Sequence, residues 1–265
     1  VWAMHAGDLD RMVSEGTGVE DDEIERRRNL ANGDDIAPLI YTSGSTGRPK
    51  GCVLTHSNFV ELSRNCFVAL NDVLTTPGAS TLLFITTAHV FARFISILNV
   101  HAGVKTGHQP DTKQLLPALG SFKPTYLLAV PRVFEKVYNS AEQKAEAGGK
   151  GKIFHAAAET AIEHSKLEQE GRKIPLGLRL KFRLFDKLVY SKLRDAMGGR
   201  VIYAVSGSAP LGPRLGHFFH SLGVVILEGY GLTETTAPAT VNTTQQMKIG
   251  TVGPVIPGVG VRLAD

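Results

Sequence analysis

The sequence predicts an α/β fold in which helices cover both faces of a mainly parallel, doubly wound sheet, an α/β/α layering. Short runs of continuous apolar residues, such as 126–130, alternate along the chain with longer stretches of helical spacing. Strands that are buried on both faces have this continuous apolar character. The composition agrees, because 43% hydrophobic residues and a net charge of only +4 over 265 residues exclude general disorder.

The first 80 residues are expected to form a partial first α/β subdomain. Residues 20–30 mix five acids with three arginines, which predicts a solvated helix. Short apolar strands are expected at 37–41 and 52–54, on either side of a Gly/Ser/Thr loop at 41–51. Ser57 is a suitable N-cap for the helix that follows, because apolar residues recur after it at helical spacing.

From residue 81 onward, strands and helices alternate. We assign 81–240 to a second α/β subdomain that carries a helical insertion at 140–197, and 241–265 to the truncated start of a β-rich subdomain. The chain starts without methionine and stops in what resembles a strand and turn, so we expect a piece of a longer protein. Strands are expected at 81–86, 104–107, 126–130, 201–205 and 224–227, and helices at 91–101, 111–119, 211–222 and from Pro131 onward.

Several features bear on the compartment. Cys52 and Cys66 have neither metal-binding nor redox spacing, which indicates buried thiols in a reducing environment. No apolar stretch approaches the roughly 18 to 20 residues that a membrane span needs. No basic-then-apolar signal segment opens the sequence. We therefore expect a cytoplasmic protein.

Residues 172–195 form a basic, amphipathic segment with eight Lys or Arg and two Asp. One interpretation is a helix that packs on the core and extends its basic side chains to solvent. The other is peripheral contact with an anionic membrane surface. Nucleic-acid binding is not expected, because the basic excess is local and no recognised module accompanies it.

The loop at 41–51, YTSGSTGRPKG, has the composition of an anion-binding loop. Glycines, Gly44 and Gly47 among them, let backbone N–H groups approach an anion closely. It is not a Walker A loop, because Pro49 stands where that motif needs its second glycine. Further donors and a positive charge come from the side chains of Thr42, Ser43, Ser45, Thr46 and Lys50.

Ligands of parallel α/β sheets bind beyond the carboxyl ends of the strands. The loops after Thr86, Val205 and Leu227 are therefore expected to form a site, and His89 lies in the first of them. His217 and His220 lie three residues apart on a predicted helix, but no third ligand accompanies them, so we expect no metal site there.

These segments resemble, in order and over nearly the whole chain, the motifs of the acyl-adenylate-forming enzymes. The loop at 41–51 resembles the family signature, 206–211 (SGSAPL) its adenine-binding turn, and 228–235 (EGYGLTET) its nucleotide and metal motif. Together they resemble a long-chain fatty-acid–CoA ligase more than a peptide-synthetase adenylation domain or a luciferase. Further matching segments are 88–94, 130–134 and 253–258.

The resemblance implies the substrates fatty acid, ATP and coenzyme A, with Mg²⁺ as cofactor. It implies catalytic roles for His89, Lys50 and Thr233, with Thr233 on the α-phosphate and His89 beside the carboxylate or that phosphate. Thr42 and Glu234 would hold Mg²⁺, whose preferred ligands are hard oxygens. The implied ATP-binding residues are Thr42, Ser43, Gly44, Ser45, Thr46, Gly47, Lys50, Gly207, Ser208, Ala209, Pro210, Glu228, Gly229, Tyr230, Gly231, Leu232 and Thr233.

Phe91, Phe94 and Phe134 are candidates for an acyl-chain tunnel, and equally for the hydrophobic core. The family's small C-terminal domain, with its adenylation lysine, lies beyond residue 265, so we expect this chain alone to be at best a weak nucleotide binder. Alternatives within the class are an acyl-AMP ligase and a medium-chain or aryl-CoA ligase. A non-catalytic basic module that docks on membranes through 172–195 is the alternative of another class, and it leaves the loop at 41–51 unexplained.

Overall fold

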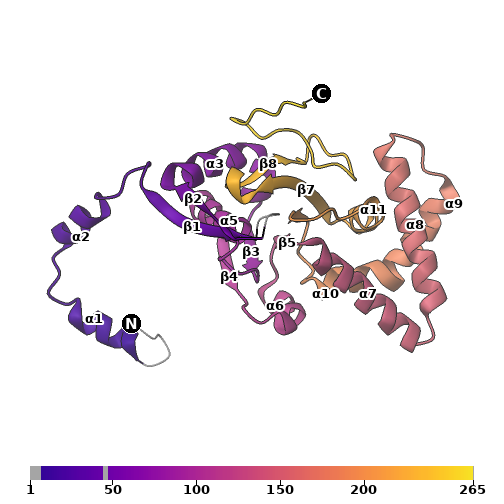
Figure 1. Ribbon diagram of the computed structural model, residues 1–265. Helices are drawn as coiled ribbons and strands as arrows, with labels where there is room; N and C mark the ends of the chain where they lie inside the picture. The colour runs from indigo at the N-terminus through magenta and orange to yellow at the C-terminus, as the bar shows by residue number, and fades with distance from the viewer. Residues whose placement is uncertain (1–6, 44–46, 265) are drawn as a thin grey trace.

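The computed structural model describes residues 7–43 and 47–264, and its centre is a six-stranded sheet of order β4-β3-β5-β6-β7-β8 (Figure 1). Every neighbouring pair is parallel except β7 and β8, which are antiparallel. This confirms the predicted α/β class with a mainly parallel sheet. The strands are β3 (Ser80–Leu83), β4 (Lys105–His108), β5 (Tyr126–Ala129), β6 (Tyr203–Ser206), β7 (Val225–Leu232) and β8 (Ala237–Val241).

Helices cover both faces of this sheet, because successive strand residues are buried against different layers. Leu127 belongs to a cluster with α6, α7, α8 and α11, whereas Leu128 belongs to a cluster with α3 and α5. The helices are α3 (His56–Ala69), α4 (Asn71–Leu74), α5 (Val90–Ala102), α6 (Leu115–Phe122), α7 (Pro131–Ala147), α8 (Gly151–Gln169), α9 (Leu176–Phe185), α10 (Ser191–Ala196) and α11 (Pro213–Ser221).

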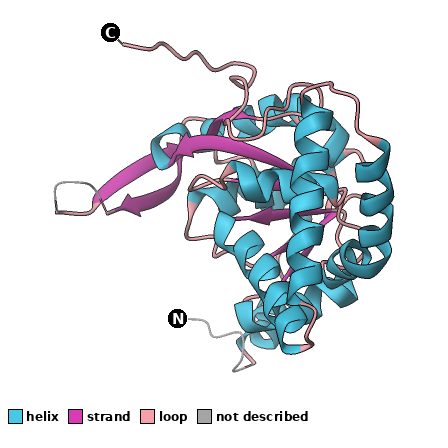
Figure 2. Ribbon diagram, turned by 90° about the vertical axis from the view of Figure 1, so that its right-hand side faces the viewer, coloured by secondary structure: helices cyan, strands magenta, loops and turns pink. Residues whose placement is uncertain are grey.

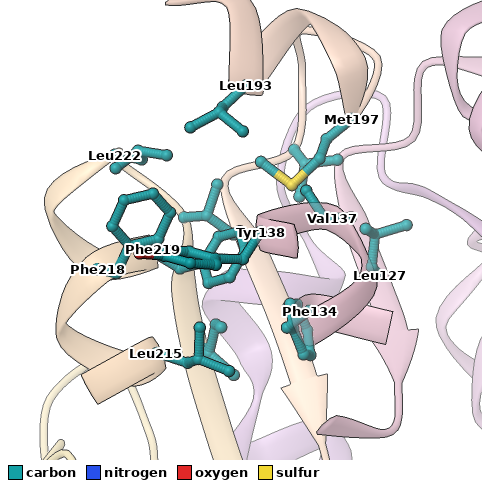
Figure 3. Packing of buried hydrophobic residues seen from close by; sticks show 14 of the residues in the cluster. Leu127, Phe134, Val137, Tyr138, Leu193, Met197, Leu215, Phe218, Phe219 and Leu222 are labelled. Atoms are coloured by element: carbon teal, nitrogen blue, oxygen red, sulfur yellow. The ribbon is translucent and has the colours of Figure 1, made fainter. Parts of the chain in front are cut away.

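Aromatic side chains dominate the first of these clusters. Phe134 is 1% exposed and packs edge-to-face against Phe219, with ring centroids 5.4 Å apart. Tyr138 packs in the same way on Phe154 and Phe218. Figure 3 shows the rings of Phe134 and Tyr138 from α7 and of Phe218 and Phe219 from α11 gathered in one cluster, with Leu127 of the sheet to one side. The aromatic contacts fix helices α7, α8 and α11 as one layer on this face.

Of the N-terminal elements, the two helices lie outside the layered body, whereas the two strands each bury one residue, Ile40 and Leu54, in the core cluster of α3 and α5. Helices α1 (Asp8–Glu15) and α2 (Asp21–Arg28) contain no buried residue, as the charged composition of 20–30 predicts. Strands β1 (Ile36–Thr42) and β2 (Lys50–Thr55) pair only with each other, in an antiparallel hairpin that projects from the body (Figure 2). The two strands predicted around the phosphate loop are therefore confirmed. The subdomain division at residue 80 stays a prediction.

Two predicted helix starts need correction. Helix α3 begins at His56, one residue before Ser57, and its N-cap is Thr55. The Asn58 backbone N–H donates to Thr55 Oγ1 (3.4 Å) and the Thr55 N–H donates to Asn58 Oδ1 (2.8 Å). This reciprocal capping box satisfies two backbone donors, which Ser57 would not do. Asp111 does cap a helical turn, but that turn is the 3₁₀ segment η2 (Thr112–Gln114), ahead of α6.

Residues 131–196, all of which the structure describes, are helical or looped and contain no strand. Between α9 and α10 the chain forms a π-helical turn, η3 (Asp186–Tyr190). Residues 242–264 contain turns, and the one bridge to them is Thr240 with Val255, so a β-rich subdomain at 241–265 stays a prediction. Among the described residues, no helix combines the length and the apolar character needed to cross a membrane.

Candidate functional site

A cavity of about 720 Å³ lies at the carboxyl edge of the sheet, beyond β3, β6 and β7. Such edges are where parallel α/β sheets bind ligands. The described residues around the cavity come from all three expected loops and from the end of β1 as well. Those that the sequence nominated are Thr42, Ser43, His89, Phe91, Phe94, Gly207, Ser208, Gly229, Tyr230, Gly231, Leu232, Thr233 and Glu234.

One wall of the cavity is the turn after β6, and Glu228 holds it in place. The Glu228 side chain is 8% exposed, and its Oε1 accepts a hydrogen bond from the Leu211 N–H (2.9 Å). Ser208 in this turn has a φ of 70°, in the left-handed region. Glu228 does not itself line the cavity. Its carboxylate is engaged with the backbone of the turn, which makes it a positioning residue.

A second wall is the tight antiparallel pair of β7 and β8. A Cβ on Gly231 would lie 1.7 Å from the Ala237 carbonyl oxygen, and one on Gly229 would lie 2.9 Å from the Thr240 carbonyl oxygen. Only glycine permits this approach of the two backbones. Because side chains alternate along a strand, Tyr230 and Leu232 are left on the cavity side. Tyr230 is 53% exposed there.

The turn η4 (Thr233–Thr235) closes the β7–β8 hairpin and presents Thr233 and Glu234 to the cavity. The Leu232 N–H donates to Thr235 Oγ1 (2.9 Å), and that hydroxyl donates in turn to the Ala237 carbonyl oxygen (2.8 Å). The Thr235 hydroxyl therefore ties both ends of the turn together. Thr233 is half-buried, and Glu234 is exposed.

Thr42 and Ser43, at the end of β1, line the same cavity as Glu234. Among the described residues, no group of three or more His, Cys, Asp or Glu is suited to hold a metal ion. Mg²⁺ commonly uses only one or two protein carboxylates and takes its remaining ligands from phosphates and water. An exposed carboxylate and a threonine hydroxyl at one cavity are therefore a suitable donor set.

Cys52 on β2 is a neighbour of this site that the sequence did not indicate. Burial and the nearby Glu234 carboxylate together raise the pKa of its thiol. The thiol is half-buried, whereas Cys66 on α3 is fully buried with a pKa raised by burial to about 12. The expectation of a buried thiol is thus confirmed for Cys66 and holds only in part for Cys52. The proximity of Cys52 to Glu234 depends on the hairpin packing, which has no local sequence signal.

Helix α5 supplies the apolar part of the cavity. His89 is its exposed N-cap residue, and Phe91 and Phe94 follow on the cavity side. Phe134, the third tunnel candidate, does not line this cavity. It lies in the other core cluster, on the opposite face of the sheet, so of its two interpretations the structure supports the core.

The remaining nominated residues lie outside the cavity lining. Gly47 and Lys50 are exposed on the β1–β2 hairpin, and Ala209 and Pro210 are exposed in the turn after β6. Gly44, Ser45 and Thr46, which were also nominated, lie outside the described residues.

Comparisons with known proteins agree with this geometry. The AMP-binding enzyme family matches residues 4–265. A long-chain-fatty-acid–CoA ligase of Mycobacterium bovis, FadD15, is 49% identical over 97% of this chain and 42% of its own length. Long chain acyl-CoA synthetase 3 of Arabidopsis thaliana is 31% identical over 96% of this chain and 37% of its own length. The chain thus spans less than half of these relatives.

Solved structures show the same fold. The inhibitor-bound N-terminal domain of FACL13 from Mycobacterium tuberculosis aligns with a TM-score of 0.57 at 20% identity, over 90% of this chain and 50% of that one. ATP-bound MatB from Rhodopseudomonas palustris aligns with a TM-score of 0.56 at 23% identity, over 86% of this chain and 35% of that one. The resemblance seen in the motifs is confirmed: the chain belongs to the family of AMP-binding enzymes.

Proposed function

We propose that the protein containing this chain activates a long-chain fatty acid in two steps. A carboxylate oxygen of the acid attacks the α-phosphorus of ATP, which forms an acyl-adenylate and releases pyrophosphate. The coenzyme A thiolate then attacks the acyl carbon, which forms the thioester and releases AMP. The observation that carries this proposal is a single cavity that joins phosphate-loop and hairpin-turn hydroxyls to an apolar wall from α5.

The residues of the cavity suit the first step. Negative charge on the phosphates has to be held and oriented while the α-phosphorus reacts, so catalysis depends on positioned donors and cations. Thr233 would contact the α-phosphate. Lys50, which lies on the β1–β2 hairpin, would neutralise negative charge on the phosphates. Mg²⁺, held by Glu234 and Thr42, would supply further charge neutralisation on the phosphates. His89 would orient the carboxylate from the start of α5.

The nucleotide base and the acyl chain would occupy different walls. Tyr230 offers an exposed ring on which adenine can stack, opposite the turn at 207–210 that Glu228 supports. Phe91 and Phe94 would contact the acyl chain. Several relatives carry long-chain names. Chain length in this protein is part of the proposal, and so is coenzyme A as the acceptor.

Fatty-acid-dependent exchange of labelled pyrophosphate into ATP tests the first step, with the full-length protein and this chain side by side. We expect exchange in the full-length protein, a loss of about 10²–10³-fold in Glu234→Gln, and no loss in the matched control Glu61→Gln, an exposed residue of α3. The isolated chain is expected to be inactive. Absence of exchange with every carboxylic acid would contradict adenylation itself.

The acid and acceptor preferences separate this proposal from its rivals. Medium-chain or aryl acids that outcompete hexadecanoate would indicate a ligase for those acids. Exchange without any coenzyme A thioester would indicate an acyl-AMP ligase. The cytoplasmic location expected from the sequence stays a prediction.

A specific observation favours peripheral membrane contact as a second property. Helix α9 buries Leu178 and packs Phe182 on the core, yet four leucines spaced by four residues stay exposed along it and η3. Packing on the core therefore accounts for only part of this amphipathic segment. The exposed fractions are 73% for Leu176, 58% for Leu180, 56% for Leu184 and 46% for Leu188.

Exposed basic side chains flank this leucine stripe, among them Arg179, Lys181 and Arg183. An apolar stripe with basic flanks is the pattern of helices that lie in an anionic membrane interface. We expect the full-length protein to co-sediment with phosphatidylglycerol-containing vesicles, and Leu180→Gln with Leu184→Gln to release it. Equal binding by the double variant would contradict this contact. Vesicle binding without any exchange activity would favour the non-catalytic membrane module.

A further inference from the structure

A second cavity, of about 520 Å³, lies within the helical layer on the other face of the sheet. Its volume falls in the range of about 300–1,000 Å³ that is common for small-molecule sites. Val137 of α7, Phe154 of α8 and Leu193 of α10 form buried parts of its wall. Among the described residues, the two cavities share no lining side chain. The second cavity is therefore not an extension of the candidate active site.

Three lysines lie around this otherwise largely apolar cavity. Lys144 comes from the end of α7, Lys150 from the turn before α8, and Lys192 from α10. All three are exposed, and within residues 7–43 and 47–264 none of them pairs with a carboxylate. Three positive charges from separate elements therefore surround one opening.

Two acidic side chains of α7, on either side of Lys144 in the sequence, contact another group. Glu142 and Glu146 approach the His155 ring, at 3.5 and 3.8 Å. Neither carboxylate forms an ion pair with Lys144, Lys150 or Lys192. An anionic group at the opening would meet lysines that have no competing partner.

The entrance itself is apolar and partly exposed. Ile153 on α8 is 43% exposed and Leu188 on η3 is 46% exposed, and both line the cavity. The π-helical turn places Leu188 and Val189 consecutively on the cavity wall. Such turns within helices are frequent at functional sites. A chain entering between Ile153 and Leu188 would pass from exposed to buried apolar contacts.

We propose that this second cavity binds a single acyl chain of a monomeric amphiphile with an anionic headgroup. The apolar walls take the chain, and Lys144, Lys150 and Lys192 bind the carboxylate or phosphate at the rim. Free long-chain carboxylates fit this description. A phospholipid of an anionic membrane offers the same chemistry from another source, and the test separates the two. The site is independent of the proposed adenylation reaction.

Native mass spectrometry of the full-length protein with hexadecanoate tests the stoichiometry. We expect two bound chains in the wild type and one in Ala141→Trp, because Ala141 lines the second cavity and an indole would fill it. Affinity at the second site should rise about fourfold per added methylene, as burial of hydrocarbon predicts. A folded Ala141→Trp that binds as many chains as the wild type would overturn the proposal, whether or not the candidate active site also holds a chain.

A second variant, which removes positive charge at the rim, tests the same cavity if Ala141→Trp does not fold. Changing Lys144, Lys150 and Lys192 together to Gln should weaken the second chain about tenfold, since each exposed ion pair contributes only a few-fold. The matched control changes Lys113, Lys136 and Lys152, which are exposed but line neither cavity. Equal weakening in both triple variants, or uncharged methyl hexadecanoate binding as tightly as hexadecanoate, would overturn the lysine contact.

Vesicles of phosphatidylcholine with and without phosphatidylglycerol decide the source of the amphiphile. If the ligand is a monomeric amphiphile, the variant with all three lysines changed should sediment with these vesicles as the wild type does. Vesicle binding that depends on the three lysines, with no second hexadecanoate, would assign the cavity to a membrane lipid and overturn a free amphiphile.

Discussion

At the scale of single residues, Glu228 shows how a buried acid supports a site without lining it. Its Oε1 accepts the Leu211 N–H, and removing it leaves that buried donor unsatisfied. We expect Glu228→Ala to lower the free energy of unfolding by about 1–3 kcal/mol and to raise the KM for ATP. Glu228→Gln keeps an acceptor oxygen and should cost less. Urea denaturation and exchange kinetics check this, and equal losses in both variants would contradict it.

The position of Gly231 has no room for a side chain. Its Cβ would lie 1.7 Å from the Ala237 carbonyl oxygen, so Gly231→Ala must separate β7 from β8. We expect a loss of roughly 1–3 kcal/mol of stability, as for other overpacked sites, together with weaker nucleotide binding. The control Gly177→Ala in α9, where nothing lies within 4 Å, should be neutral or slightly stabilising. Thermal unfolding of the two variants distinguishes them.

At the scale of elements, α8 and α11 meet through a buried polar cluster. Ser165 Oγ lies 2.9 Å from His217 Nδ1 and 3.1 Å from His220 Nδ1. Burial lowers the pKa of both histidines. Lys166 further lowers and Glu170 raises the pKa of His217, while Glu168 raises and His164 lowers that of His220.

These lowered pKa values predict how stability depends on pH. Between the folded-state pKa and the ordinary value of about 6.5, the unfolded chain binds more protons than the folded one. Stability should therefore be full above about pH 6.5, fall as the pH drops below it, and level off below the folded-state pKa. His217→Gln with His220→Gln should flatten this dependence in urea titrations, and the exposed control His56→Gln should not. An unchanged slope in the double variant would contradict the prediction.

Two substitutions at the start of α3 test whether Thr55 or Ser57 is its N-cap. Thr55→Ala removes one half of the capping box with Asn58, and we expect it to cost about 0.5–2 kcal/mol. Ser57→Ala, at the position that sequence spacing favours, should cost less than this. Denaturant midpoints decide between the two positions, and the reverse order would restore Ser57 as the cap.

At the scale of the whole molecule, the sheet separates two cavities. The candidate site lies among residues of one core cluster and the second cavity among residues of the other. Substitutions that share no partner usually add within about 0.3–0.5 kcal/mol. We expect the unfolding costs of Glu234→Gln and Ala141→Trp to add in the double variant. A larger coupling energy would show that the faces communicate through the sheet.

Much of the fold was predictable because its strands and helices have local patterns of apolar residues in the sequence. Apolar runs and helical spacing located the strands and helices within a few residues, since burial on both faces leaves a continuous apolar run. The motif strings at 41–51 and 228–235 predicted the family and part of the cavity lining, and the segments 88–94 and 206–211 predicted a further part. Glycine strings are informative because close backbone approach excludes every other residue, as at Gly231.

The sequence alone therefore determined the fold class, the family and the edge of the sheet at which the candidate site lies. Only the tertiary structure decided that Phe134 lies in the core on the face away from the cavity, and that Phe91 and the buried Phe94 line the cavity, because either packing satisfies the same apolar spacing. It also decided the partner of Glu228 and the existence of the second cavity. These features arise from contacts between segments far apart in the chain, and local residue spacing carries no information about such contacts.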